Sequence, residues 1–515
     1  TLIMTREDIV QEIQRLLRDE VGKSHMSESA YDIGWLVRLV DKERRDHPRY
    51  PKLFERLQSI QHADGSWGSQ IPFAHDRVIS TLSVIAGVST WSLNETWKER
   101  IHNGLRAIES FAPKLLNESE ATVAFELLFP KLLDEIKQQG YAVNIPSSIL
   151  ARYDKLYKEK LTKLPLNTAM NRPSTLLHAL EALDDDIDVH PFAKFQSSNG
   201  SFGLSPAATA SMLLKGVGGK KAEEYLDLFT QSSKIPFLWP IDIFEINWCL
   251  FPLFFLNLNN QFQDLINPLV SYLQKFWTSG GVGLSKDFSV PDIDDTSTAF
   301  YLIQCSGQKL DIRAFEYFET ADGFMCYSGE RSGSASHYAD LLFALSTCER
   351  DSRVDRMKRK ILDFLFSTQH HDGHWDDKWN ISPYYATSRI ILALVHEKEA
   401  TSFVDRAMRY IIETQHKNGL WGFGSGTIEE SAYALVALFY YSKSRVMAEK
   451  EILQIQTGFE AIMRNMDKQN YPGLWIGKSL YTPSVIVRLT ILSTIFAFLE
   501  YDESTKITIK NTEGV

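Results

Sequence analysis

A short pattern, Q-x3-G-x-(W/F), occurs four times in this chain, beginning at Gln61, Gln196, Gln369 and Gln415. In each copy Asp-Gly or Asn-Gly suits a tight turn, the Gln amide can bond free backbone groups at helix ends, and the aromatic ring can pack over the turn. Most other segments have apolar residues three and four apart, which indicates helices, and strand alternation is scarce. Repeated helical pairs predict helical barrels, in which these motifs have a structural role.

Two copies of the pattern lie before residue 210 and two after residue 365 of the 515 residues. This placement predicts an all-α chain with two helical barrels, which agrees with the domain number expected for this length. A chain of this size can bury a substantial core without disulfides.

Charge and cysteine spacing exclude several classes of protein. The net charge is −10 and no long basic run occurs, which disfavours nucleic-acid binding. The four cysteines contain no CxxC pair, so we expect neither a zinc ribbon nor a disulfide framework, and the reducing cytoplasm is the simplest compartment. The longest region that reads as apolar, Trp248–Leu258, is about half a membrane span, and the first residues lack a signal pattern. We therefore expect no integral membrane segment.

Three carboxyls are crowded in Val290-Pro-Asp292-Ile-Asp294-Asp295-Thr, where Pro291 suits the start of a helix. Asp292 and Asp295 share a helical face, so near an apolar run the three acids cannot all ionise easily. At least one should stay protonated at neutral pH. A neutral carboxylic acid in an apolar cavity could protonate an alkene if an aromatic wall stabilised the cation. A helix cap with solvated acids, or a Mg²⁺ site, would give the same spacing.

A second acidic run, Asp184-Asp-Asp-Ile-Asp188, formally fits D-D-x-x-D. It lies in an expected loop and lacks an acidic partner motif, so we interpret it as a solvated loop. The chain has 30 Phe, 20 Tyr and 11 Trp, which fits either a large core or an aromatic-lined cavity.

Asp292-Ile-Asp294-Asp295-Thr296 matches a D-x-D-D-T motif, and other stretches extend the match, in the same order, over about residues 25–480. They include Ser29–Trp35, Ala74–Arg77, Phe125–Pro130, Pro173–Glu181, Pro240–Trp248 and Asp377–Trp379. The sequence therefore resembles class II diterpene cyclases of the copalyl diphosphate synthase type, in their compact bacterial form. D-x-D-D with Q-x3-G-x-W is shared with squalene–hopene cyclases, and the Pro173 and Pro240 stretches point to the diterpene enzymes.

The resemblance implies two α/α-barrel domains with the active site between them. We expect a β domain of residues 1–45 plus 261–515 and an inserted γ domain of residues 46–260. No residues remain after about residue 500 for the family's third, ionising domain, so we expect no ionisation chemistry.

The resemblance also implies roles for the acids and lysines. Asp294 should be the general acid, with Asp292 and Asp295 tuning and orienting it. Asp340 falls where plant relatives carry an Asn that bonds the acid. Lys160 and Lys378 match lysines that hold the diphosphate, although either could be a plain surface lysine.

Further residues match the family's cavity and metal positions. Trp248 and Trp421 match cavity aromatics. His178 matches a His that, with an Asn, holds a proton-accepting water in plant ent-copalyl diphosphate synthases, but Phe237 occupies the Asn position. His178 could therefore be a base or only a core histidine. Acidic residues in the region of the family's Mg²⁺ motif are Glu118, Glu120 and Glu126.

These residues predict a cyclase that protonates geranylgeranyl diphosphate, closes two rings and keeps the diphosphate, with Mg²⁺ as cofactor. The product would be of the copalyl, halimadienyl or kolavenyl type, passed to a class I terpene synthase or a phosphatase, and a homodimer is possible. Alternatives are a C15 or C30 cyclase (drimenyl or squalene–hopene type) and a non-catalytic helical-toroid binding module. A protein prenyltransferase β-subunit would need a zinc set that the isolated cysteines do not supply.

Overall fold

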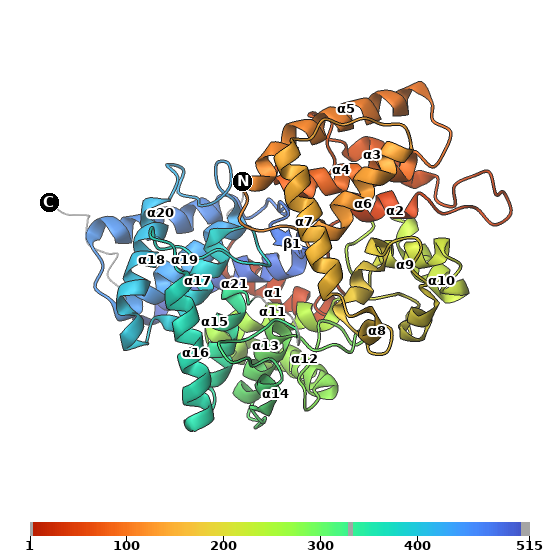
Figure 1. Ribbon diagram of the computed structural model, residues 1–515. Coiled ribbons are helices and arrows are strands. Elements are labelled where there is room, and N and C mark those ends of the chain that lie inside the picture. The colour runs from red at the N-terminus through yellow and green to blue at the C-terminus, as the bar shows by residue number, and fades with distance from the viewer. Residues whose placement is uncertain (1–3, 328–332, 506–515) are drawn as a thin grey trace.

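The computed structural model describes residues 4–327 and 333–505, which form two groups of helices (Figure 1). The orange-to-yellow group comprises α2 (Ala30–Leu36), α3 (Lys52–Ile60), α4 (Ala74–Val88), α5 (Glu95–Phe111), α6 (Phe125–Gln138), α7 (Ser147–Lys163), α8 (Leu166–Ala169), α9 (Pro206–Leu214) and α10 (Gly219–Thr230), with 3₁₀ turns η1 (Ala112–Leu116), η2 (Thr175–Ala182) and η3 (His190–Phe195). Its inner ring runs α2, α4, α6, η2 and α9, and α9 returns to α2.

The second group is green to blue in Figure 1, with the red helix α1 added. It comprises α1 (Arg6–Asp19), α11 (Asp242–Phe255), α12 (Gln263–Phe276), α13 (Ile293–Cys305), α14 (Arg313–Glu316), α15 (Ala335–Ser346), α16 (Ser352–Thr368), α17 (Pro383–Leu394), α18 (Thr401–Glu413), α19 (Ile428–Ser444), α20 (Glu449–Met463) and α21 (Ser484–Thr505), with η4 (Asn259–Phe262) and η5 (Lys398–Ala400). The ring α11–α13–α15–α17–α19–α21 closes on itself because α21 contacts α11.

Inner and outer helices differ in the way they are buried. Inner helices such as α13 and α19 are buried around most of their circumference, whereas outer helices such as α16 and α18 bury one stripe. An apolar helix must be enclosed on all sides, and an amphipathic helix suits the outside of a barrel. The expected all-α fold with two α/α-barrels is thus what the chain forms.

The rings divide the chain differently from the predicted domains. Ala30–Leu36 belongs to the first ring and Asp242–Phe255 to the second. The boundaries predicted at 45/46 and 260/261 place both helices in the opposite domain. The difference arises because both helices are almost fully buried and therefore pack where an inner position is open, which turn composition does not reveal.

Each of the four repeated motifs connects an outer segment to the next inner helix, and its hydrogen bonds reach the outer segment that follows. In each copy the Gln amide donates to the carbonyl of its own Gly and to a carbonyl at the start of the next outer segment; Gln369, for example, bonds Gly373 at 2.9 Å and Phe403 at 2.9 Å. The indole N–H of Trp375 donates to the Leu365 carbonyl at 2.9 Å. The structural role predicted for the motif is what these bonds describe.

A small hairpin lies between the two groups. Strands β1 (Trp475–Ile476) and β2 (Leu480–Tyr481) pair antiparallel, with Trp475 opposite Tyr481. Its turn reaches the first barrel, since the Val123 amide donates to the Gly477 carbonyl at 2.8 Å. Two-residue strands leave no alternation in the sequence, so the hairpin was not predicted.

Helix α21 contains a longer apolar region than Trp248–Leu258, which the sequence analysis took as the longest. Its window Ser484–Tyr501 is long and apolar enough to cross a membrane by composition, and 67% of that window is buried inside the molecule. It packs on α1, α11 and α19. Among the described residues it alone passes this test.

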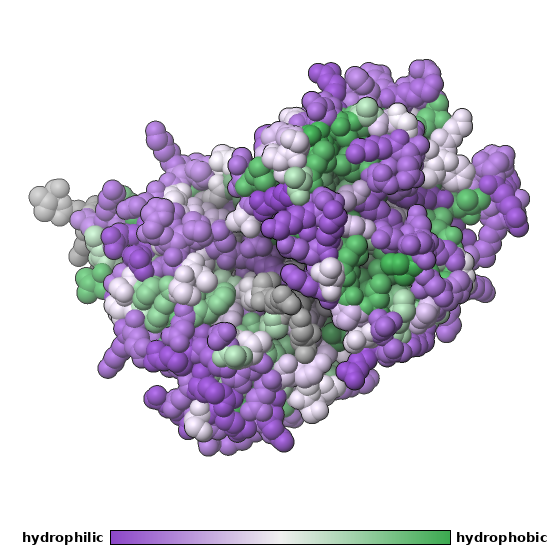
Figure 2. Space-filling view, in the orientation of Figure 1, coloured by the Kyte–Doolittle hydropathy of each residue, from purple (hydrophilic) through white to green (hydrophobic). Residues whose placement is uncertain are grey.

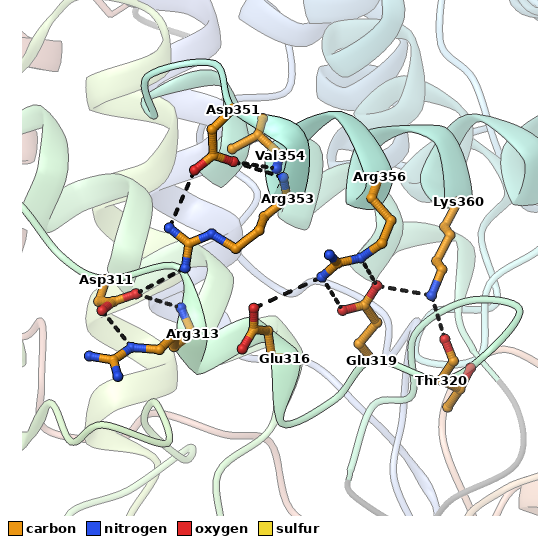
Figure 3. A network of polar contacts seen from close by, with 10 residues as sticks. All are labelled: Asp311, Arg313, Glu316, Glu319, Thr320, Asp351, Arg353, Val354, Arg356 and Lys360. Carbon is orange, nitrogen blue, oxygen red and sulfur yellow. Dashed lines mark hydrogen bonds and ion pairs between the residues drawn. The ribbon is translucent and has the colours of Figure 1, made fainter.

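An exposed network fixes the segment that leads from α14 toward the acid motif (Figure 3). Glu319 accepts from Arg356 at 2.9 Å and from Lys360 at 2.9 Å, both on α16. Isolated surface ion pairs contribute little, but one carboxylate shared by two cations restrains the chain more. The segment continues to Cys326, which contacts the acid motif. The visible molecular face is mainly hydrophilic, with separate apolar patches (Figure 2).

Candidate active site

The acid motif forms the N-terminus of the inner helix α13. Asp292 is the N-cap, in extended conformation, and its carboxylate accepts from the Asp295 backbone amide at 2.7 Å. Asp294 and Asp295 lie in the first turn. All three are almost fully buried, and Asp294, at 9% exposed against 3% and 2%, is the most accessible. The motif is therefore a helix cap, as one alternative predicted, but its acids are buried and not solvated.

Burial sets the protonation of this motif. It raises the pKa of Asp292 and of Asp294 well above the usual range, and neighbouring carboxyls add to the rise. The pKa of Asp295 rises only to about 7 because the Asn247 amide donates to its carboxylate at 2.8 Å. Burial therefore favours the protonated form of Asp294, in a site that has little contact with solvent.

Asp340 on α15 also raises the pKa of Asp294. Its negative charge is the largest cause, after burial, of the raised pKa of Asp294. Burial also raises the pKa of Asp340, to about 6, and the Arg389 guanidinium, which donates to it at 2.5 Å, opposes that rise. Arg389 lies 4.1 Å from the Phe251 ring centroid, so the ion pair is enclosed by aromatic rings.

Two further groups that the sequence analysis missed contact or adjoin Asp294. The Cys326 thiol donates to an Asp294 oxygen at 3.1 Å. His337 on α15 is fully buried, which lowers its pKa to about 3 and keeps it neutral. Both are distant in sequence from the motif, and only the loose alignment that singled out Asp340 pointed to α15.

The predicted metal glutamates gather in one cavity of about 250 Å³ beside α7. Glu118, Glu120 and Glu126 line it together with Lys160. Lys160 pairs with Glu126 at 3.3 Å. Glu118 already accepts from the Ala74 and His75 backbone amides and from the His75 ring, so it also caps α4.

Lys378 comes to the same region from the second barrel. Burial raises the pKa of Glu120 to about 7, Asp377 adds to the rise and Lys378 opposes it. The Lys378 ammonium lies 5.0 Å from the Trp379 ring centroid. Lys160 and Lys378 therefore both adjoin the glutamates, from opposite barrels.

The two predicted cavity tryptophans have different surroundings. Trp248 donates to the Tyr385 hydroxyl at 3.0 Å and lines an apolar cavity of about 50 Å³ with Tyr385, Arg389 and Trp475. Trp421 instead fills the turn of its own repeat, where its indole donates to the Ile411 carbonyl at 2.7 Å. Its contacts are those of Trp67 and Trp375 in the other copies, and it lies outside the residues that line this cavity.

His178 and Phe237 lie around a buried ammonium. The His178 ring bonds the Gly203 carbonyl at 2.5 Å, while its other nitrogen has no partner among the described residues. Burial lowers the pKa of His178 to about 4. Lys478, in the hairpin turn, donates to the His178 carbonyl at 2.8 Å and lies 5.9 Å from the Phe237 ring centroid. Lys478 also pairs with Glu181, and both side chains are fully buried.

The second acidic run does lie in a loop, as expected, with Asp185 and Asp186 exposed. Asp184 accepts from the Tyr157 hydroxyl at 2.8 Å, and Asp185 pairs with Lys131 at 3.5 Å. These contacts are those of a surface loop.

A family model for the squalene–hopene cyclase C-terminal domain matches residues 333–443. A "Type B diterpene cyclase" of Mycobacterium tuberculosis (strain ATCC 25618 / H37Rv) is 30% identical over 489 residues, which cover 91% of this chain and 95% of that protein. "Copalyl diphosphate synthase 1" of Selaginella moellendorffii is 30% identical over 73% of this chain, which spans about half (51%) of that protein.

Solved structures share the fold. An ent-copalyl diphosphate synthase from Streptomyces platensis matches with a TM-score of 0.78 at 24% identity, over 96% of this chain and 99% of that one. The Arabidopsis thaliana ent-copalyl diphosphate synthase matches with a TM-score of 0.72 at 22% identity, over 97% of this chain and 64% of that one.

Proposed function

The chain belongs to the class II diterpene cyclases, and we propose that it converts geranylgeranyl diphosphate into a bicyclic diterpenyl diphosphate. The diphosphate would stay intact, and the product would have a copalyl, halimadienyl or kolavenyl skeleton. The names of the relatives support a C20 diphosphate substrate.

The main support for this reaction is the protonated carboxyl of Asp294. An alkene is a very weak base, so a proton donor for it must be neutral, shielded from water and accessible to the substrate. Asp294 combines a raised pKa with the greatest accessibility of the three acids. Asp292 and Asp295 hold the turn that presents it.

The proposed sequence of steps balances without a co-reactant. The Asp294 O–H proton adds to the terminal alkene, two C–C bonds form as the cation moves along the chain, and a C–H proton leaves at the end. Aromatic side chains such as Trp248, Tyr385 and Trp475 supply the π faces that stabilise cations. Asp294 regains a proton from solvent before the next turnover.

The cavity lined by the glutamates fits the diphosphate and Mg²⁺. Carboxylate oxygens suit Mg²⁺, and ammonium groups suit phosphate. We propose that Glu120 and Glu126 hold Mg²⁺ and that Lys160 and Lys378 bind the diphosphate, whose charge the metal would neutralise. Glu118 would support the site through its bonds to the α4 amides, since its oxygens already accept hydrogen bonds.

The last proton is the step that fixes the product. The unpartnered nitrogen of His178 is a neutral buried base, and Phe237 replaces the Asn that would help to hold a water. We propose that His178 accepts the proton directly or that the cation rearranges first. The aromatic at residue 237 therefore favours a product other than plain ent-copalyl diphosphate.

We propose that side chains around the cavity beside Trp248 move when the substrate binds. The apolar cavity beside Trp248 holds about 50 Å³, whereas sites that enclose ligands of this size measure ~300–1,000 Å³. Arg389 lines that cavity and is the longest polar side chain in its wall.

The deciding experiment incubates the purified protein with Mg²⁺ and geranylgeranyl diphosphate, removes phosphate enzymatically, and identifies the alcohols by mass spectrometry and NMR. We expect a bicyclic alcohol from the natural sequence and at least ~100-fold less from Asp294→Asn, because the amide cannot donate an equivalent proton. Asp186→Asn, in the exposed loop, is the matched control and should retain activity. Geranylgeraniol alone from the natural sequence would reject this substrate, and farnesyl diphosphate would then test the C15 alternative.

A further inference from the structure

Three possible metal ligands surround the acidic group of Asp294. An Asp294 oxygen, the Cys326 sulfur and a His337 ring nitrogen lie within 4.8 Å of one another. They come from α13, from the segment after α14, and from α15, so tertiary packing alone brings them together. Cys326 and His337 are buried, and Asp294 retains some accessibility.

These atoms are a donor set for zinc and not for magnesium. Zn²⁺ binds thiolate, imidazole and carboxylate at ~2.0–2.3 Å in tetrahedral geometry. Ligand atoms that already lie within 4.8 Å of one another can therefore close on the ion after small side-chain movements. Mg²⁺ prefers oxygen ligands. The buried His337 imidazole supplies a ring nitrogen, and a neutral imidazole is the form that binds metals.

We propose that Zn²⁺, or another thiophilic divalent cation, binds at Asp294, Cys326 and His337 and inhibits the cyclase by occupying the proton donor. Binding displaces the Cys326 S–H proton and the Asp294 O–H proton to solvent as the metal–ligand bonds form. The thiolate and the carboxylate then balance the charge of the cation. That binding abolishes turnover rests on the proposed role of Asp294, whereas the binding itself does not.

The charges around the site favour a cation. Asp340, which Arg389 partly neutralises, and Asp377 both place negative charge near Asp294. The positive charge of Lys378, which acts on His337, opposes a cation at this position. A bound diphosphate would neutralise Lys378 and so remove this opposing charge. Substrate binding is therefore not expected to expel the metal by charge repulsion.

A second group of ligands on the surface must be separated from this site. His370, His374 and Asp376 also lie within ligand distance of one another. In other copies of the repeat the equivalent histidines bond backbone carbonyls, as His416 bonds Gly422 at 2.7 Å. At His370 a carboxylate of Asp376 takes that position at 2.9 Å. This surface group contains no sulfur, so a thiolate signal distinguishes the two sites.

Co²⁺ titration followed by absorption tests binding without any substrate. A thiolate-to-cobalt charge-transfer band should appear in the natural sequence and disappear when Zn²⁺ displaces the cobalt. Cys326→Ser should lack the band, while Cys305→Ser, which removes an exposed thiol outside the site, should keep it. Absence of the band in the natural sequence, or its persistence in Cys326→Ser, overturns the proposal.

Inhibition is measured separately, and each variant is compared with its own rate in Mg²⁺ without added Zn²⁺. Loss even of groups that only support a ligand costs about 10- to 100-fold in affinity, so Cys326→Ser should raise the half-inhibitory Zn²⁺ concentration at least tenfold. A chelator should restore the natural sequence. Turnover that Zn²⁺ leaves unchanged overturns the inference, whereas a cobalt band in a protein that cyclises no prenyl diphosphate leaves the site standing and rejects the proposed function.

Discussion

The acidity of Asp294 depends on charges that belong to other elements. The carboxyl acts only while protonated, so the cyclisation rate should fall as the pH rises through its pKa. Asp340 raises that pKa by its negative charge, and Arg389 partly neutralises Asp340. The donor is thus tuned by an ion pair between α15 and α17 that does not need to touch it.

Asp340→Asn should move the alkaline limb of the pH–rate profile to lower pH. The substitution removes a negative charge and leaves the Arg389 cation unpaired, and both changes favour ionised Asp294. We expect a shift of about 1 pH unit, the lower end of what one neighbouring charge produces. The measurement is the cyclisation rate at saturating substrate against pH, with Asp186→Asn as control. A limb that stays in place or moves to higher pH would show that Asp340 does not tune the acid.

His178→Phe tests whether this residue is a base or a core histidine. A ring is kept against Phe288, whose centroid lies 4.2 Å away, but the unpartnered nitrogen is lost. If His178 accepts the final proton, substrate should still be consumed while the mixture of products changes. Gas chromatography of the dephosphorylated alcohols reports both quantities. An unchanged product spectrum would assign His178 a packing role.

The motif residues could be predicted from the sequence, but their partners could not. Asp292, Asp294 and Asp295 are adjacent in the chain and their spacing defines a helix start. Cys326 and Arg389 reach the site from segments separated by tens of residues, and nothing local marks them. Trp421 is the opposite case. The sequence predicted that it lines the cavity, but in the structure it fills the turn of its own repeat.

Helices were predictable because outer helices carry an amphipathic pattern and the repeats end four of the outer segments with the same turn. The turn glycines have positive φ, as at Gly373 with φ of +105°. A Cβ there would collide with the backbone carbonyl of Arg406, which lies within α18. Domain boundaries were less predictable, because inner helices such as α2 and α11 have similar hydrophobic patterns. Only their contacts in the closed rings show to which barrel each belongs.

Gly373→Ala should destabilise the protein more than Gly307→Ala. Both glycines have positive φ, at +105° and +95°, so alanine costs about 1–2 kcal/mol of backbone strain at either position. A Cβ at Gly307 meets nothing within 4 Å, whereas at Gly373 it collides with backbone and adds about 1–3 kcal/mol. Urea denaturation of both variants gives the comparison. Equal losses would mean that the close approach between repeat and helix does not contribute.

The two barrels are joined by polar groups that are buried between them. The hairpin turn supplies Lys478, which donates to the Ser205 hydroxyl at 2.8 Å and pairs with Glu181. Asp76 of α4 accepts from the Leu480 amide at 3.0 Å. Buried ion pairs stabilise little against an apolar replacement but are costly to break, so they favour one relative placement of the barrels. That placement is what sets the glutamate cavity beside Lys378.

The interior also holds carboxyls that stay protonated, which gives the whole molecule a defined pH response. Burial raises the pKa of Glu429 from 4.5 to about 8 and that of Asp32 from 3.8 to about 7. Between the unfolded and folded values the native state binds more protons, so stability falls as pH rises. His178 and His337 have lowered pKa values and act in the opposite direction, but only below their unfolded value of 6.5.

Above pH ~6.5 the carboxyls therefore determine the slope. Glu429 alone should lower the free energy of unfolding by about 1.4 kcal/mol per pH unit up to about pH 8. Glu429→Gln should flatten this decline because the amide does not titrate. The amide oxygen can still accept from Tyr433 and Trp475, which donate to Glu429 at 2.7 and 2.8 Å. The exposed Glu413→Gln is the control and should keep the natural slope. Urea denaturation at half-unit steps of pH measures it, and a natural sequence whose stability rises over this range would show that Glu429 is ionised in the folded protein.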